Sequence, residues 1–263
     1  MISAINFNTN RQTGLCARNN VFYAAPKLKN DVFIKSDSNV AFKGKEGLFK
    51  TNPTLVPRVV VLPGVSDEFV TKITKQISEF SADWLLKLKK NNYKIILSPT
   101  YSEAYRYQGV IDPIVEAAEK KNPKGTLAVT YTDGVIKNFF VFCDKPPYSN
   151  DYMPEIVNHE LSHGVVNVAG LNNDKKVIGE LKKDVELIMQ EQKMDKLTPA
   201  ENAMVTHCFF NPNAHLPIDE ILSDVYAWNK GRGCYGSGLV MGVKNPNLMG
   251  TLFPNLSECL KTV

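Results

Sequence analysis

The pattern of apolar and polar positions changes at about residue 57, where strands and helices become recognisable. The run "RVVVLPGV" is short, apolar and closed by Pro-Gly, which is typical of a buried strand. Between Ser66 and Lys90, apolar side chains recur at three- and four-residue spacing, which predicts a helix that is broken near Ser81. The run "NYKIILSP" predicts a second strand.

A β-hairpin and a series of helices follow. In "GTLAVTYTDGVIKNFFVF", two β-rich runs flank Asp133-Gly134, a dipeptide suited to a type I′ turn. The chain then reads as helical to about Lys230, with a capping box from Thr198 to Glu201 and a stop at Gly231. The order strand, helix, strand, hairpin and helices predicts an α+β domain with a mixed, twisted sheet, and no internal repeat is present.

Residues 1–55 differ from the rest of the chain in composition and in the pattern of apolar positions. They are rich in Asn, Lys and Ser, their apolar residues form small isolated clusters, and no periodicity persists. Such a segment buries too little apolar surface to offset its ordering entropy. We therefore expect a basic, poorly ordered tail over residues 1–55 and one folded domain over residues 56–263. A docking or export role for the tail is the alternative.

Charge and cysteine usage exclude several classes of protein. The chain has 31 Lys/Arg and 27 Asp/Glu, of which eight and three lie in residues 1–55, so the basic excess belongs to the tail. A net charge of +4 does not indicate a dedicated nucleic-acid-binding protein. The five cysteines are scattered without a CxxC pair, which argues against a disulfide framework and a zinc ribbon. We expect reduced thiols, no standard secretory signal and no membrane span.

The stretch "VNHELSHGVVN" carries the clearest chemical signal. His159 and His163 stand four residues apart, so on a helix they project from one face, as two ligands of one zinc ion do. Glu160 follows the first histidine and could take a proton from a water held by the metal. Apolar residues between Val157 and Val168 fall on the opposite face, so the ligand face is distinct from the packing face.

A second helix supplies candidates for the third ligand. In "PIDEILSDVYAW", the apolar residues form one stripe, and Glu220 and Asp224 form a separate acidic ridge. A hydrolytic zinc site has three protein ligands and an open position. We assign Glu220 as the third ligand and Asp224 as the acceptor of a hydrogen bond from the back nitrogen of a ligand histidine. A solvated acidic face is the plainer alternative.

"HELSH" followed by "DEILSD" resembles the gluzincin metallopeptidases, thermolysin-like enzymes among them, whose second helix carries an [Asn/Asp]-Glu-x-x-Ser-Asp pattern. The resemblance implies a zincin-like domain in which His159, His163 and Glu220 hold one zinc ion. It makes Glu160 the general base and Asp224 the partner of His159. Residues 57–230 are also loosely similar to the compact lethal-factor-like and Pro-Pro endopeptidase group.

The sequence departs from that group at two positions. Asn167 replaces an aspartate late in the motif helix, and Asn213 stands where the group has a tyrosine seven residues before the ligand glutamate. A donor to the substrate oxyanion is still required. His215 is our first candidate and Tyr235 the second, whereas we interpret His207 as a packing residue.

These features together predict a zinc-dependent endopeptidase that acts on a protein or peptide substrate, with an edge strand of the hairpin able to pair with it. We expect a monomer that binds neither nucleic acid nor a bilayer, and that is cytoplasmic or exported without a standard signal. Two alternatives remain open: a zinc protein that is not a peptidase, and a toxin-like effector whose tail directs a catalytic domain.

Overall fold

The structure is a computed structural model. It describes residues 56–109, 113–121, 128–131, 138–145, 153–190, 195, 197–199, 218–230 and 248–263. All of them belong to one compact unit of the chain. The predicted tail lies outside the described residues, as do the predicted turn at Asp133-Gly134, the end of the capping box at Glu201 and the stop at Gly231.

The described strands form one mixed sheet. They are β1 (Arg58–Val61), β2 (Lys94–Ser98), β3 (Ala128–Tyr131) and β4 (Phe139–Cys143), in the order β1-β2-β4-β3. The β1–β2 and β2–β4 pairs are parallel, and β3–β4 is antiparallel with Thr130 opposite Phe140. The predicted strands, the antiparallel pairing of the two hairpin strands and the mixed sheet are confirmed. Among the described strands, β3 lies at an edge.

The helical segment between the first two strands also follows the prediction. It divides into α1 (Asp67–Ser78) and α2 (Ala82–Lys90), with the break at Ser81. The hydroxyl of Ser66 caps α1 by accepting from the amide of Phe69. Apolar side chains on the inner face, such as Ile73 and Ile77, are fully buried.

Two short helices that the sequence analysis did not predict follow β2. They are α3 (Tyr101–Tyr107) and α4 (Pro113–Lys121). Glu119 of α4 accepts hydrogen bonds from the first amides of α3, those of Tyr101 and Ser102, at 2.8 Å each. Its carboxylate also pairs with the ammonium of Lys145 at 2.8 Å. These contacts between distant segments stabilise a helix that is too short to be favoured by its own sequence.

Helices account for most of the described residues after the hairpin. They are α5 (Met153–Ala169), α6 (Lys175–Met189), α8 (Ile218–Asn229), α9 (Leu248–Leu252) and α10 (Pro254–Leu260), with the 3-10 turn η2 (Leu171–Asn173) after α5. Gly170 ends α5 with a φ of 67°, the left-handed conformation that glycine adopts without steric cost. None of the described helices is long and apolar enough to cross a membrane.

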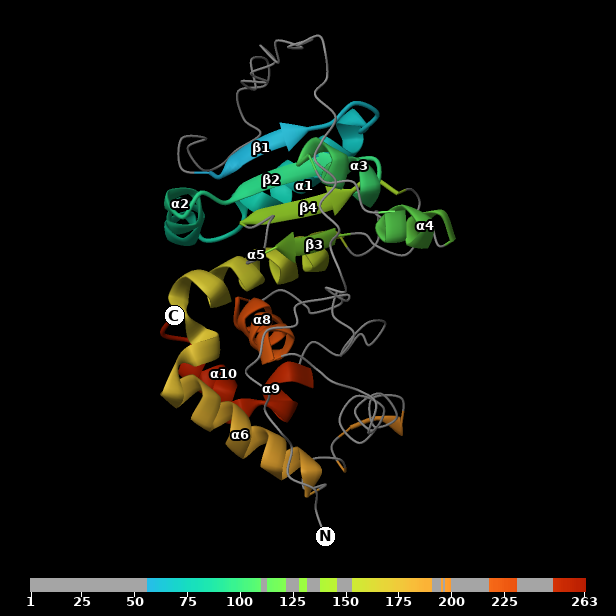
Figure 1. Cartoon of the computed structure of the whole chain (residues 1–263). Helices are drawn as coiled ribbons and strands as arrows, with labels where there is room; N and C mark the ends of the chain where they lie inside the picture. The colour runs from blue at the N-terminus through green and yellow to red at the C-terminus, as the bar shows by residue number, and fades with distance from the viewer. Residues whose placement is uncertain are drawn as a thin grey trace. The chain divides into compact units, whose positions relative to one another are not determined.

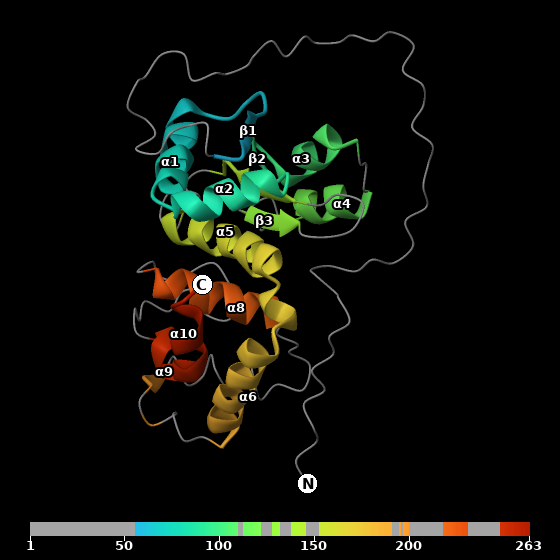
Figure 2. The ribbon, with the colours of Figure 1, turned by 90° about the vertical axis from the view of Figure 1, so that its left-hand side faces the viewer.

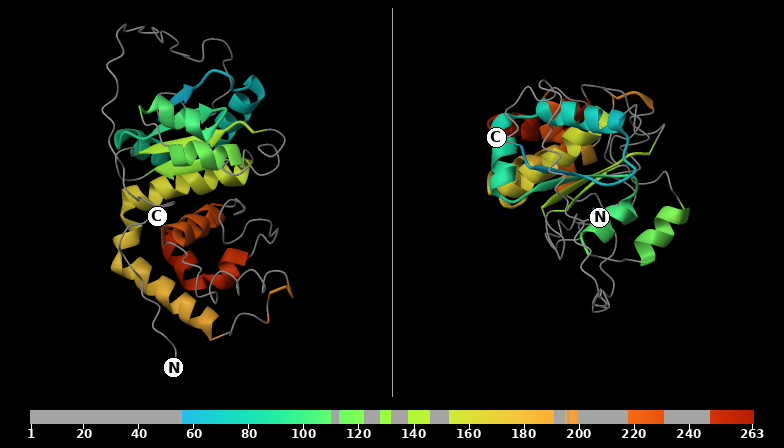
Figure 3. Two further views of the ribbon diagram at one scale, coloured as in Figure 1. Left: turned by 45° about the vertical axis from the view of Figure 1, so that its right-hand side comes forward. Right: turned by 90° about the horizontal axis from the view of Figure 1, so that it is seen from above.

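Helix α5 occupies the centre of this unit. It contacts α1, α2, β3 and β4 on one side and α8 on the other, as two perpendicular views show (Figures 1 and 2). Helix α10 packs against α6, α8 and α9 (Figure 3). Val157, Leu161 and Val165 of α5 are completely buried. A mixed sheet with mostly helical surroundings fits the predicted α+β class, and its zincin-like character remains a prediction.

Close packing fixes the position of α5 against the sheet. A Cβ atom at Gly164 would lie 2.6 Å from Cζ of Phe140 and 2.7 Å from Cδ2 of Leu88. Only glycine therefore lets α5 approach β4 and α2 this closely. Because Gly164 directly follows His163, this contact also sets how close the histidine pair lies to the sheet.

Candidate metal centre

The two histidines of α5 direct the same ring atom toward each other. Their spacing of four residues places the rings 4.6 Å apart at an interplanar angle of 87°. Nε2 of His163 lies 3.0 Å from Nε2 of His159. Both residues are buried. Two imidazole nitrogens of buried side chains are thus held side by side.

Helix α8 adds a carboxylate to this pair. Oε2 of Glu220 lies 3.2 Å from Nε2 of His159 and 3.5 Å from Nε2 of His163. The three donor atoms form a triangle with edges of 3.0, 3.2 and 3.5 Å. Ligands of a tetrahedral zinc ion with bonds of 2.0–2.1 Å are separated by roughly 3.3–3.4 Å. His159, His163 and Glu220 could therefore hold one metal ion.

The opposite nitrogens of both rings have partners on α8. Nδ1 of His159 lies 2.8 Å from Oδ1 of Asp224, and Nδ1 of His163 lies 3.0 Å from Oγ of Ser223. Asp224 and Ser223 are both completely buried. If each Nδ1 carries the proton of a neutral ring, the lone pair is at Nε2. The carboxylate of Asp224 favours this tautomer at His159, and the hydroxyl of Ser223 can accept from His163 in the same tautomer, which is the one that a metal ligand requires.

Glu160 lies beside the histidine pair and contacts the edge strand. Its Oε2 lies 2.5 Å from the hydroxyl oxygen of Thr130 on β3, and its main-chain carbonyl oxygen lies 3.1 Å from the same hydroxyl. The glutamate is buried. A carboxylate held next to three convergent donor atoms is suited to accept a proton from a molecule bound there.

The electrostatics favour a positive charge at the centre of the triangle. Burial alone would lower the pKa of His159, but the charge of Asp224 and hydrogen bonds to Asp224 and Glu220 outweigh it and hold that pKa well above 6.5. Burial would also lower the pKa of His163, but its hydrogen bond to Glu220 and the charges of Glu220 and Glu160 together raise it. Burial would raise the pKa of Glu220, yet the two histidines hold it well below its ordinary range. Protons or a cation can supply this charge.

Several residues considered in the sequence analysis lie outside the described residues. They are His207, Asn213, His215 and Tyr235. The choice of oxyanion donor therefore stays a prediction. Asn167 is described, and its Nδ2 donates to the hydroxyl of Tyr93 at 2.8 Å. Burial raises the pKa of Tyr93 to about 12, although this hydrogen bond opposes the rise.

Two contacts of the site were missed by sequence reasoning. Ser223 lies within "DEILSD", so its position next to Asp224 could have suggested that it serves the second histidine. Thr130 gives no such signal. It reaches Glu160 only because β3 packs on α5, and no short motif encodes that contact.

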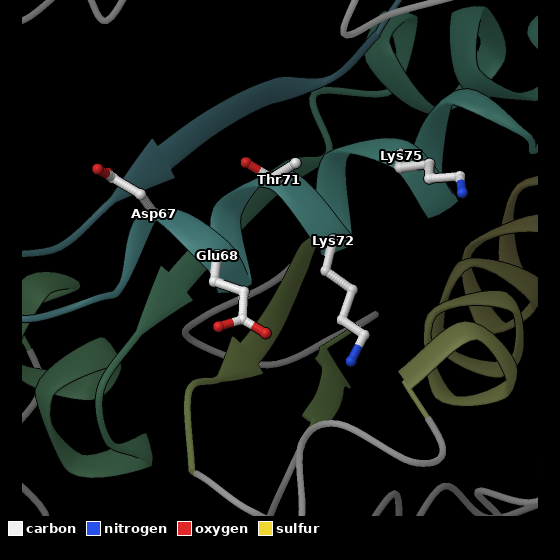
Figure 4. A pocket seen from close by; sticks show the side chains of 5 residues that line it. All are labelled: Asp67, Glu68, Thr71, Lys72 and Lys75. Atoms are coloured by element: carbon white, nitrogen blue, oxygen red, sulfur yellow. The ribbon is translucent and has the colours of Figure 1, made fainter.

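A shallow hollow on the surface of α1 contains none of the residues of the metal centre. It is lined by Asp67, Glu68, Thr71, Lys72 and Lys75 (Figure 4). These side chains all come from one helix, with the acidic residues in its first turn and the lysines further along it. The triangle of His159, His163 and Glu220 is therefore the better candidate for chemistry.

Comparisons with family models, with curated proteins and with solved structures find no match to this chain.

Proposed function

We propose that the chain is a zinc-dependent endopeptidase of the gluzincin type. His159, His163 and Glu220 are the proposed ligands of one zinc ion, and Glu160 is the proposed general base. One observation carries the proposal. Three donor atoms from two helices lie 3.0–3.5 Å from one another, while Asp224 and Ser223 contact the Nδ1 atoms of the two histidine rings. Two imidazoles and one carboxylate are the ligand set of several hydrolytic zinc sites.

The chemistry of the donor atoms favours zinc over a harder cation. Imidazole nitrogen suits zinc and its transition-metal neighbours, whereas calcium and magnesium prefer oxygen ligands. Among the described residues, the site contains two nitrogens, one oxygen and no thiolate. Three protein ligands leave an open position, which a structural zinc site does not have.

The proposed reaction divides the work between the ion and the protein. When bound, zinc supplies Lewis acidity that polarises a carbonyl and lowers the pKa of water. Glu160 accepts a proton from the attacking water and then delivers it to the leaving amine. Asp224 and Ser223 hold the histidine rings in place while the charges at the site change. Because β3 lies at the edge among the described strands, it could offer an extended peptide a strand to pair with beside Glu160.

The proposal is tested by metal analysis and by digestion of a peptide library. The wild-type chain is expected to bind one zinc ion and to cleave peptides, whereas Glu160→Gln keeps the zinc and loses at least about 100-fold in turnover. Ligand variants such as His163→Ala lose both. Zinc binding without cleavage by the wild type would indicate a non-peptidase zinc protein. Cleavage that survives in Glu160→Gln would exclude the proposed base.

A further inference from the structure

We propose that Thr130 is a positioning residue for Glu160. The inference deepens the proposed function and rests on it. In this account, the hydroxyl of Thr130 donates to one oxygen of the Glu160 carboxylate and fixes the orientation of the general base. The edge strand then both borders the site and sets the geometry of its proton acceptor.

The distances favour the carboxylate as the acceptor. The Thr130 hydroxyl lies 2.5 Å from Oε2 of Glu160 and 3.1 Å from the main-chain oxygen of the same residue. A hydroxyl has one proton to donate, and a charged acceptor forms the shorter and stronger bond. The hydroxyl has only one proton, so it can donate to Oε2 of Glu160 but not to the other carboxylate oxygen at the same time.

The surroundings make Thr130 a rigid donor. It lies in the centre of β3, paired with Phe140 of β4, whose side chain is completely buried. A β-branched side chain in a strand has few χ1 rotamers, so its hydroxyl direction is set by the backbone. Glutamate has three side-chain torsions, and holding its carboxylate in one place removes much of that freedom before reaction.

A purely structural contact between β3 and α5 is the competing explanation, and two variants separate it from positioning. Thr130→Val keeps the shape and removes the hydroxyl, whereas Thr130→Ser keeps the hydroxyl and removes a methyl group. Loss of one hydrogen bond to a charged group corresponds to about 10- to 100-fold in rate. We expect kcat of Thr130→Val on a cleaved peptide to fall by this factor, with KM within about two-fold and zinc content unchanged.

Thr130→Ser is expected to retain kcat within about three-fold of the wild type, since it keeps the donor. Valine and serine variants with equal kcat would overturn the inference while leaving the peptidase intact. A wild-type chain that holds zinc and cleaves nothing would overturn the proposed function and this inference with it. The two failures are therefore distinguishable.

A second measurement requires neither activity nor zinc. Urea unfolding of Thr130→Val, Glu160→Ala and the double variant, all in the presence of a chelator, forms a double-mutant cycle. If the hydroxyl binds the carboxylate, the double variant loses less stability than the sum of the two single losses. Additive losses would show that the two side chains do not interact and would overturn the inference.

Discussion

At the residue scale, the site depends on which ring nitrogen of each histidine forms a hydrogen bond within the protein. Asp224 and Ser223 contact the Nδ1 atoms, so the Nε2 atoms and Glu220 are left to converge. The two acceptors differ in charge. A carboxylate stabilises the proton on His159 more strongly than a hydroxyl stabilises the one on His163, so the two rings are not equivalent as ligands.

Replacing Asp224 by Asn should weaken zinc binding by about 10- to 100-fold. The neutral amide still orients the ring of His159, but it no longer raises the basicity of that ring as a ligand. The dissociation constant can be measured by competition with a chelator of known affinity. Asp184→Asn is the matched control. Asp184 is also completely buried, but it accepts from the backbone amide of Leu256 at 2.8 Å, at the start of α10. Equal zinc affinity in wild type and Asp224→Asn would contradict the assigned role.

At the scale of single elements, two glycines in helices predict opposite outcomes. At Gly164 of α5, a Cβ atom would collide with Phe140 and Leu88. At Gly179 of α6, it would meet nothing within 4 Å. Alanine favours a helix by about 1 kcal/mol over glycine. Alanine can contribute this stability at Gly179. At Gly164, the free-energy cost of overpacking exceeds it.

We therefore expect Gly164→Ala to lower the free energy of unfolding by about 1–3 kcal/mol. Gly179→Ala is expected to raise it by about 0.5–1 kcal/mol. Urea unfolding followed by circular dichroism measures both. If the two substitutions changed stability in the same direction, the packing of α5 against β4 described above would be wrong.

The link between α3 and α4 predicts a dependence of stability on pH. Burial would raise the pKa of Glu119, but hydrogen bonds from Lys145 and Ser102 outweigh it and lower that pKa. A group whose pKa is lower in the folded chain stabilises the fold above its unfolded pKa, and this contribution is lost as pH falls through the folded pKa. We expect Glu119→Gln to reduce stability at pH 7 and to flatten its decline in acid. Parallel pH profiles for variant and wild type would contradict this.

At the scale of the whole molecule, one ion would join two helices that pack against each other and differ in their other neighbours. Helix α5 is seated on the sheet, whereas α8 is packed with α9 and α10. The proposed ligands come from both helices. A zinc ion would therefore bind only the folded arrangement of the domain and stabilise it as a unit.

Zinc is accordingly expected to raise the thermal midpoint of the wild-type chain, and a chelator is expected to lower it. Saturation at about 1,000 times the dissociation constant contributes about 4 kcal/mol. Scanning calorimetry at several zinc concentrations measures the shift. His163→Ala, which lacks one ligand, should show a much smaller response. A midpoint that is independent of zinc in the wild type would contradict a site formed by folding.

The sequence was informative where a pattern is local. The strand runs, the break at Ser81 and the pairing of the two hairpin strands follow from periodicity and turn signals, and the structure confirms them, whereas the predicted turn lies outside the described residues. The convergence of His159, His163 and Glu220 could be anticipated because both motifs are short and helical. Helix α3 has a local cap at Thr100 that was missed. In contrast, Glu119 reaches the start of α3 from α4, and Thr130 reaches Glu160 across the packing of β3 on α5. Such contacts join residues far apart in the sequence, so no local pattern reveals them.

X-ray absorption at the zinc edge tests the central claim most directly. The zinc-loaded chain should contain one ion per molecule, with two imidazole nitrogens and oxygen ligands at about 2.0–2.1 Å. His159→Ala and His163→Ala, which each lack one proposed ligand, should take up little or no zinc. A spectrum dominated by sulfur at about 2.3 Å, or a chain that takes up no zinc, would contradict a metal centre built from α5 and α8.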